Sequence, residues 1–258
     1  MMLNQSFLPL ILSLIAGLST TIGAFILFFS KTKNLKLITF ALSFSAGVMI
    51  TVSFTDLFSS AEETLSKYFG NYKGVLLSLF FLISGAIIAL LIDKFIPNEN
   101  ISINNSNPKK LYRVGFVSMI ALIIHNFPEG IATFVSGYEN TSLGISITLA
   151  IALHNIPEGI AIAMPIYYST NSKFKAFKFT LYSGLAEPLG AFIAFLFLRP
   201  YINEIILSVI FALVAGIMLY ISFAELIPTA KEYKYNNTYL ISIFLGIIII
   251  ILSHMYSH

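Results

Sequence analysis

Apolar residues fill eight long stretches that short polar segments separate, and this pattern predicts an all-α polytopic membrane protein. The expected transmembrane helices cover residues 6–30, 36–60, 74–96, 114–137, 142–168, 175–198, 203–229 and 238–256. Each stretch has about the 20 residues that an α-helix needs to cross the hydrocarbon core of a bilayer. Eight such helices with short connections use almost all of the 258 residues, so no separate soluble domain is expected.

Composition supports the membrane interpretation. The chain is 57% hydrophobic and 10% charged, with a mean hydropathy of +0.86, whereas a soluble domain has roughly 25% charged residues. The lipid bilayer is therefore an expected partner, and no nucleic-acid partner is expected. The sequence contains no cysteine, which excludes disulfides and thiolate metal sites.

Basic residues gather on one side of the predicted membrane topology. Twelve lysines and arginines follow the odd-numbered helices, at positions 31, 33, 36, 94, 109, 110, 113, 173, 175, 178, 231 and 234, and three lie on the other side, at 67, 73 and 199. Because such residues favour the cytoplasm, we expect a multi-pass protein of the cell membrane with both termini extracytoplasmic. The one long connection, residues 98–112, is then a cytoplasmic loop.

The chain contains an internal repeat. Residues 46–49 (AGVM) correspond to 215–218 (AGIM) at an offset of 169, and residues 23–26 (GAFI) correspond to 190–193 at an offset of 167. Since five crossings separate the copies, they run through the membrane in opposite directions, as in the inverted repeats of secondary transporters. The expected organisation is a first repeat at 1–97, the loop at 98–112, a metal-binding helix pair at 113–169 and a second repeat at 173–258.

The central helix pair carries one hexapeptide twice. His125-Asn126-Phe127-Pro128-Glu129-Gly130 recurs 29 residues later as His154-Asn155-Ile156-Pro157-Glu158-Gly159. In each copy the His and the Glu, at i and i+4, share one face of a helix. Ionisable residues inside a membrane span are costly and mark functional sites. The two copies, on antiparallel neighbours, are predicted to form two walls of one site.

Proline and a third carboxylate extend this site. Pro128 and Pro157 cannot donate a backbone hydrogen bond, so each is expected to interrupt or bend its helix beside the ligands. The segment Gly184–Gly190 places Glu187 and Pro188 near the middle of the sixth helix. We therefore expect Glu187 to reach the site from the second repeat.

The combined donors suit divalent transition metals. The candidate ligands are His125, Asn126, Glu129, His154, Asn155, Glu158 and Glu187. They are enough for two adjacent ions, with Glu129 and Glu158 as bridges. Imidazole, carboxylate and amide ligands suit Zn(II), Fe(II) and Mn(II). These ions are expected as transported substrates rather than as resident cofactors, imported by alternating access.

Asp56 and Glu225 occupy corresponding positions of the two repeats. They could form entry and exit sites for the metal, or they could be polar residues near helix ends. Asp93 is expected to extend to the membrane interface. The sequence does not determine whether the chain forms a homodimer.

Two other functions are open alternatives. A metal-selective channel would use the same ligands and would differ in its kinetics. An intramembrane metal-dependent hydrolase is less compatible, because the motif lacks the His-Glu-x-x-His arrangement that supplies a general base. We therefore expect a transporter and not an enzyme.

With these motifs the sequence resembles the ZIP (Zrt/Irt-like) divalent metal transporters, and is most similar to their bacterial ZupT/GufA-like branch. The resemblance covers the whole chain and implies a binuclear centre. By position, the first metal site would comprise His125, Glu129, His154 and Glu158, and the second Asn126, Glu129, Asn155, Glu158 and Glu187. The loop between the third and fourth helices lacks the histidines found in many relatives.

Overall fold

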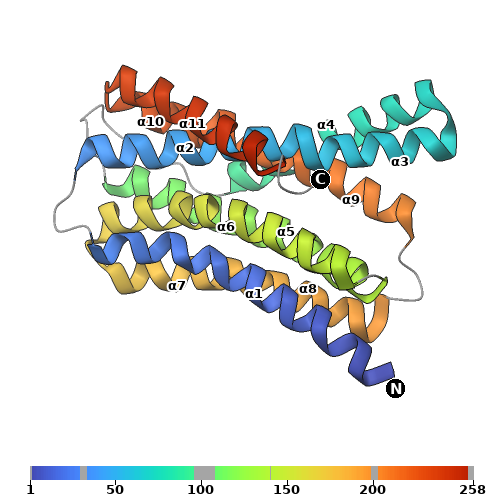
Figure 1. Ribbon diagram of the computed structural model, residues 1–258. Helices are drawn as coiled ribbons and strands as arrows, with labels where there is room; N and C mark the ends of the chain where they lie inside the picture. The colour runs from blue at the N-terminus through green and yellow to red at the C-terminus, as the bar shows by residue number, and fades with distance from the viewer. Residues whose placement is uncertain (1, 30–33, 96–107, 140, 199–202, 255–258) are drawn as a thin grey trace.

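The described part of the chain is helical almost throughout (Figure 1). The computed structural model describes residues 2–29, 34–95, 108–139, 141–198 and 203–254, and within these ranges it contains no strand. Six of the helical segments are long and apolar enough to cross a membrane, and Asn236–Leu252 is a shorter apolar helix. The predicted all-α membrane fold is confirmed.

The helices follow one another with short connections. Their bounds are α1 Met2–Phe29, α2 Leu35–Val52, α3 Ser59–Phe69, α4 Asn71–Phe95, α5 Pro108–Glu139, α6 Thr141–Thr170, α7 Lys173–Gly184, α8 Ala186–Ile193, α9 Glu204–Ile221, α10 Ile227–Glu232 and α11 Asn236–His254. Three π-helical segments, η1 Ser53–Phe58, η2 Ala194–Leu198 and η3 Ser222–Leu226, continue α2, α8 and α9 without a break. The described ranges therefore contain eight helical rods, which correspond to the eight predicted spans.

Two predicted boundaries were wrong. The second rod was expected to end at residue 60 but runs through α3 to Phe69, where Gly70, with φ of 84°, ends it. Gly70 adopts this left-handed conformation without a steric penalty. α5 begins at Pro108, so residues 108–112 belong to a helix and not to the predicted loop. Proline suits the first turn of a helix because no intrahelical donor is needed there. Residues 98–107 of the predicted loop lie outside the described part.

The rods form two layers (Figure 1). In one layer, α1 packs on α6 and α7, while α5 packs on α6 and α8. In the other, α2 packs on α11, and α4 packs on α3 and α9. Short connections between spans predict that consecutive rods are neighbours, but α1 and α2 belong to different layers. Contacts of α2 with α6 and of α5 with α9 join the layers.

Candidate metal centre

Helices α5, α6 and α8 bring six of the seven predicted ligands into the buried interior of the first layer. These are His125, Asn126 and Glu129 of α5, Asn155 and Glu158 of α6, and Glu187 of α8, and all six are at most 3% exposed. The seventh, His154, belongs to α6, but its side chain lies outside the described part of the structure. We call this set of seven residues the metal centre.

The backbone around the metal centre is less interrupted than the prolines suggested. α5 continues through Pro128 and α6 continues through Pro157, so the predicted interruption at each hexapeptide is wrong, while the predicted bend stays a prediction. Neighbouring helices and side chains let a membrane helix keep a proline by satisfying the freed backbone groups. Ser45 Oγ of α2 also donates to the carbonyl oxygen of Pro157 itself at 2.6 Å, which ties α2 to this turn of α6.

The sixth rod, in contrast, is interrupted beside its ligand. α7 ends at Gly184, Leu185 forms a turn, and α8 begins at Ala186. Pro188 follows Glu187 and cannot donate to the carbonyl of Gly184, four residues earlier. Glu187 therefore lies in the first turn of the half-helix α8.

An imidazole links the two hexapeptides. His125 Nε2 lies 3.3 Å from Glu129 Oε1 on the same helix and 3.2 Å from Glu158 Oε1 on α6. The first of these contacts is the i,i+4 pair that the hexapeptide predicts. The second shows that the two copies face each other across one shared space.

Both asparagines use their amide NH₂ groups within the protein. Asn155 Nδ2 donates to Glu187 Oε2 at 2.9 Å and to the carbonyl of Ala16 at 3.0 Å. Asn126 Nδ2 donates to the carbonyl of Ser183 at 3.1 Å. These bonds fix the amides and leave their oxygens as the remaining acceptors.

Several buried oxygens of the metal centre accept no hydrogen bond from any described residue. They are Asn126 Oδ1, Asn155 Oδ1, Glu158 Oε2 and Glu187 Oε1. Buried acceptors almost always have a donor, because an unmatched one loses its hydration without compensation. Two amide oxygens and two carboxylate oxygens of this kind, within a group of three buried carboxylates, form an environment suited to a cation.

The described side chains are not arranged as a finished coordination shell. No group of three or more His, Asp and Glu among the described residues has the spacing of an ion-holding cluster. Instead His125 contacts the carboxylates that would share an ion with it. Binding a metal at this centre therefore requires these side chains to separate.

The glycine that closes each hexapeptide permits the close helix packing around the centre. A Cβ added to Gly130 would lie 1.8 Å from the carbonyl oxygen of Glu187, and one added to Gly159 would lie 1.8 Å from that of Thr20. Small residues let membrane helices approach to backbone contact. The hexapeptide therefore carries ligands and a packing position together.

The two predicted pathway residues lie in corresponding π-helical segments. Asp56, in η1, is partly exposed and accepts a hydrogen bond from Thr55 at 2.9 Å. Glu225, in η3, is 7% exposed, and its Oε1 accepts from Arg113 Nη1 at 3.0 Å. The structure therefore gives the two carboxylates different surroundings.

Sequence reasoning did not identify the cluster around Glu225. Arg113 also donates to Asp93, and the Tyr220 hydroxyl donates to Asp93 Oδ2 at 3.1 Å. We call Asp93, Arg113, Tyr220 and Glu225 the Arg113 cluster. It joins α4 and α9 to α5 and thus connects the two layers. Asp93 is paired within the protein and does not simply extend to the interface as predicted. In the sequence, Arg113 could be recognised only as a basic residue near the start of a span.

Comparisons with known proteins identify the family. Residues 98–254 match the family model described as "ZIP Zinc transporter". The chain is 44% identical to a "Zinc transporter ZupT" of Streptococcus mutans, over 98% of each chain. It is 48% identical to one of Chlorobaculum parvum, over 86% of this chain and 87% of the relative, and 45% identical to one of Oceanobacillus iheyensis, over 90% and 91%. This protein belongs to the ZIP family of zinc transporters.

Proposed function

We propose that the protein imports Zn(II) across the cell membrane into the cytoplasm, with Fe(II) and Mn(II) as further substrates. The carrying observation is the set of buried oxygens at the metal centre that accept no hydrogen bond from a described residue, beside three carboxylates from three helices. Buried like charges repel one another unless cations compensate them. The similar proteins named zinc transporters support zinc as the principal ion.

In this proposal the two hexapeptides and Glu187 form one binuclear site. His125 lies against a carboxylate of each copy, so Glu129 and Glu158 can bridge two ions once the imidazole withdraws. Asn155, fixed by Glu187 and by the Ala16 carbonyl, supplies an oxygen from α6. A mixed nitrogen and oxygen set without sulfur suits borderline divalent ions, and passage requires that they also leave.

We further propose that the chain is an inverted repeat that exposes the centre to each side in turn. Corresponding glycines make corresponding contacts: a Cβ on Gly47 would lie 2.3 Å from the carbonyl oxygen of Ile243, and one on Gly216 would lie 1.9 Å from that of Leu82. The π-helical segments η1 and η3 also lie at the repeat offset. Both contacts lie within the layer of α2, α4, α9 and α11, and the other layer carries the metal centre. Such an arrangement around a central site suits alternating access.

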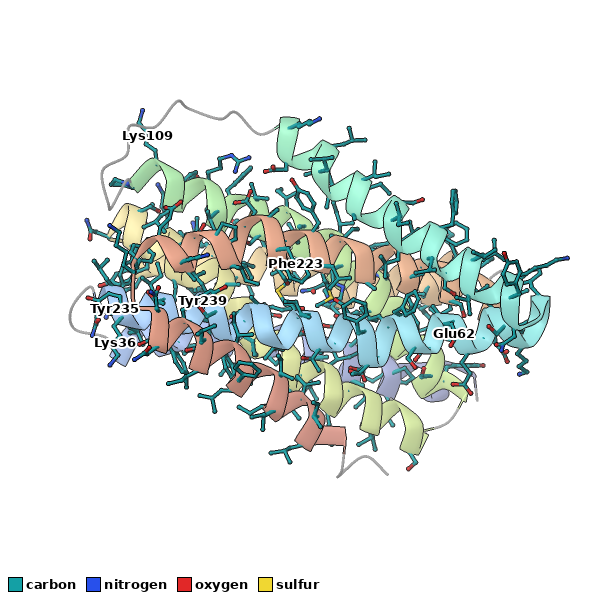
Figure 2. The ribbon with its side chains drawn as sticks, turned by 90° about the horizontal axis from the view of Figure 1, so that it is seen from above. Lys36, Glu62, Lys109, Phe223, Tyr235 and Tyr239 are labelled. Atoms are coloured by element: carbon teal, nitrogen blue, oxygen red, sulfur yellow. The ribbon has the colours of Figure 1, made fainter. Side chains whose placement is uncertain are left out.

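The ends of the molecule support the proposed orientation. Figure 2 places Lys36 and Lys109 toward one end and Glu62 toward the other. With the end that carries Lys36 and Lys109 in the cytoplasm, Glu225 lies on the exit side, where it accepts a hydrogen bond from Arg113. Asp56, in the other repeat, then lies on the entry side.

Zinc uptake into proteoliposomes tests this function. We expect Glu129→Ala and Glu158→Ala to reduce uptake to the level of empty vesicles, and Glu63→Ala, at an exposed position of α3, to keep wild-type uptake. Saturable uptake indicates a carrier, and single-channel currents indicate a channel. Wild-type transport by either ligand variant would refute the proposed centre.

A further inference from the structure

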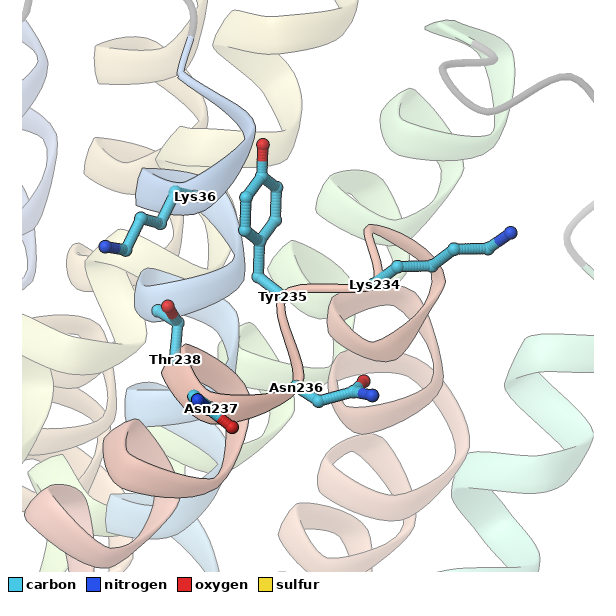
Figure 3. Close-up of a pocket in the computed structure, with 6 residues that line it drawn as sticks. All are labelled: Lys36, Lys234, Tyr235, Asn236, Asn237 and Thr238. Carbon is cyan, nitrogen blue, oxygen red and sulfur yellow. The ribbon is translucent and has the colours of Figure 1, made fainter.

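A polar cavity lies in the layer of α2 and α11, at the end of the molecule that carries Lys36. None of the residues that line it belongs to the metal centre. The cavity measures about 400 Å³ and is lined by Lys36, Lys234, Tyr235, Asn236, Asn237 and Thr238. We call it the Lys36 pocket. Figure 3 shows that the lining comes from the start of α2, the turn after α10 and the first turn of α11, with Lys36 and Lys234 extending on either side of Tyr235.

The backbone of the Lys36 pocket is held in place. Asn34 caps α2 by accepting a hydrogen bond from the Lys36 N–H at 2.9 Å, and Tyr168 of α6 bonds both backbone groups of Asn34, at 2.7 and 2.8 Å. On the other wall, Lys234 has φ of 59°, and its N–H donates to Lys231 at 3.1 Å. The two lysines therefore project from fixed positions.

The charge of the Lys36 pocket is positive and unmatched. Its lining contains two lysines and no carboxylate. Neither lysine forms an ion pair with a residue in the described ranges. Lysine is a flexible point charge that commonly binds phosphate, and the asparagine and threonine side chains add hydrogen-bonding groups. This chemistry selects an anion with several oxygen atoms.

The surface next to the pocket is apolar. α2 and α11 pack directly on each other, so that a Cβ on Gly246 would lie 2.4 Å from the carbonyl oxygen of Phe44. On the same two helices the large side chains Phe40, Leu240, Ile241 and Phe244 are exposed. In a membrane protein such a surface contacts acyl chains. An anion bound at the pocket can thus carry hydrocarbon chains along this seam.

We propose that the Lys36 pocket binds the phosphate headgroup of an anionic phospholipid, whose acyl chains lie on the exposed face of α2 and α11. Basic pockets between transmembrane helices bind such headgroups. Because the pocket includes the turn that joins α10 to α11, the lipid links these helices to α2. This inference concerns lipid binding and is independent of the metal that the protein carries.

Thermal unfolding of the purified full-length protein in detergent tests the proposal. We expect phosphatidylglycerol to raise the midpoint temperature of unfolding, and phosphatidylcholine or inorganic phosphate to leave that temperature unchanged. The double variant Lys36→Gln/Lys234→Gln should lose at least about half of the shift, whereas Lys36→Arg/Lys234→Arg should keep it. Lys67→Gln/Lys73→Gln, with the same charge change on the opposite side of the predicted topology, should also keep the shift.

Two results would overturn the proposal. An equal shift in Lys36→Gln/Lys234→Gln and in the wild type would show that the lipid binds elsewhere. An equal shift with inorganic phosphate would show a site for soluble anions and not for lipid. Should the glutamine variant be too unstable for this assay, native mass spectrometry of the wild type and the arginine variant provides a second measurement. Both should retain phosphatidylglycerol in preference to phosphatidylcholine, and no preference in either would also refute the site.

Discussion

The metal centre and the Arg113 cluster both contain carboxylates with little exposure, but the protein treats them differently. In the Arg113 cluster, Glu225 accepts from an arginine and Asp93 accepts from the same arginine and a tyrosine. In the metal centre, Glu158 Oε2 and Glu187 Oε1 receive no hydrogen bond from a described residue. A carboxylate paired with a resident arginine is compensated within the protein, whereas we propose that the oxygens without a described donor are compensated by the transported cation.

The largest expected effect separates binding from stability at the metal centre. Glu158→Gln keeps the shape of the side chain but removes the charge of a proposed bridging ligand. Substitution of a residue that only orients a metal's ligands already lowers metal affinity about 10–100-fold. We expect zinc binding, measured by calorimetry, to weaken by at least about 100-fold. The metal-free variant should unfold at or above the wild-type temperature, because one of three buried carboxylates that repel one another has been neutralised. A clear fall in that temperature would show that Glu158 has a structural role.

The opposite outcome is expected at the Arg113 cluster. Arg113→Ala leaves Asp93 and Glu225 without their cation, and breaking a buried ion pair in this way typically costs about 3 kcal/mol of unfolding free energy. Chemical denaturation should show this loss, while zinc affinity at the metal centre stays within about threefold of the wild-type value. Adding Glu225→Gln should restore part of the stability. If Arg113→Ala abolished zinc binding, the two regions would not be separable.

A smaller loss of stability is expected from a change in the packing between the second hexapeptide, on α6, and α1. Gly159→Ala places a methyl group where the Thr20 carbonyl oxygen lies, and overpacking of this kind costs about 1–3 kcal/mol. Thermal unfolding should detect the loss. Because α6 must move away from α1, zinc affinity should also fall. Unchanged unfolding would show that the two helices are not in close contact in the membrane.

The smallest effect is expected where charges are solvated. Lys67 and Glu204 form an ion pair of 3.5 Å with side chains that are 68% and 61% exposed. Exposed pairs contribute roughly 0–1 kcal/mol, so Glu204→Gln should change the unfolding free energy by less than about 0.5 kcal/mol. A loss as large as that of Arg113→Ala would contradict the link between burial and effect.

The sequence predicted the membrane helices and most of the candidate ligands, because both depend on local patterns. Eight apolar stretches correspond to eight rods, and the i,i+4 spacing of His125 and Glu129 gives the observed contact. The prediction that Pro128 would interrupt α5 was wrong, since the helix continues through it, while a bend there stays a prediction. The structure brings the described candidates together, but the ligand roles of all seven residues, and those of Asp56 and Glu225 in the pathway, stay predictions.

Burial and charge compensation, in contrast, depend on neighbours that are distant in the chain. The sequence by itself determined the membrane-spanning helices and the chemistry of the ligands, because hydropathy and helical periodicity are local properties. Only the tertiary structure decided that α1 and α2 lie in different layers, that His125 reaches Glu158, and that Arg113 pairs with Glu225. These contacts join residues that are distant in the chain, so that Glu225 pairs with Arg113, while Glu158 and Glu187 each keep one oxygen that accepts no hydrogen bond from a described residue.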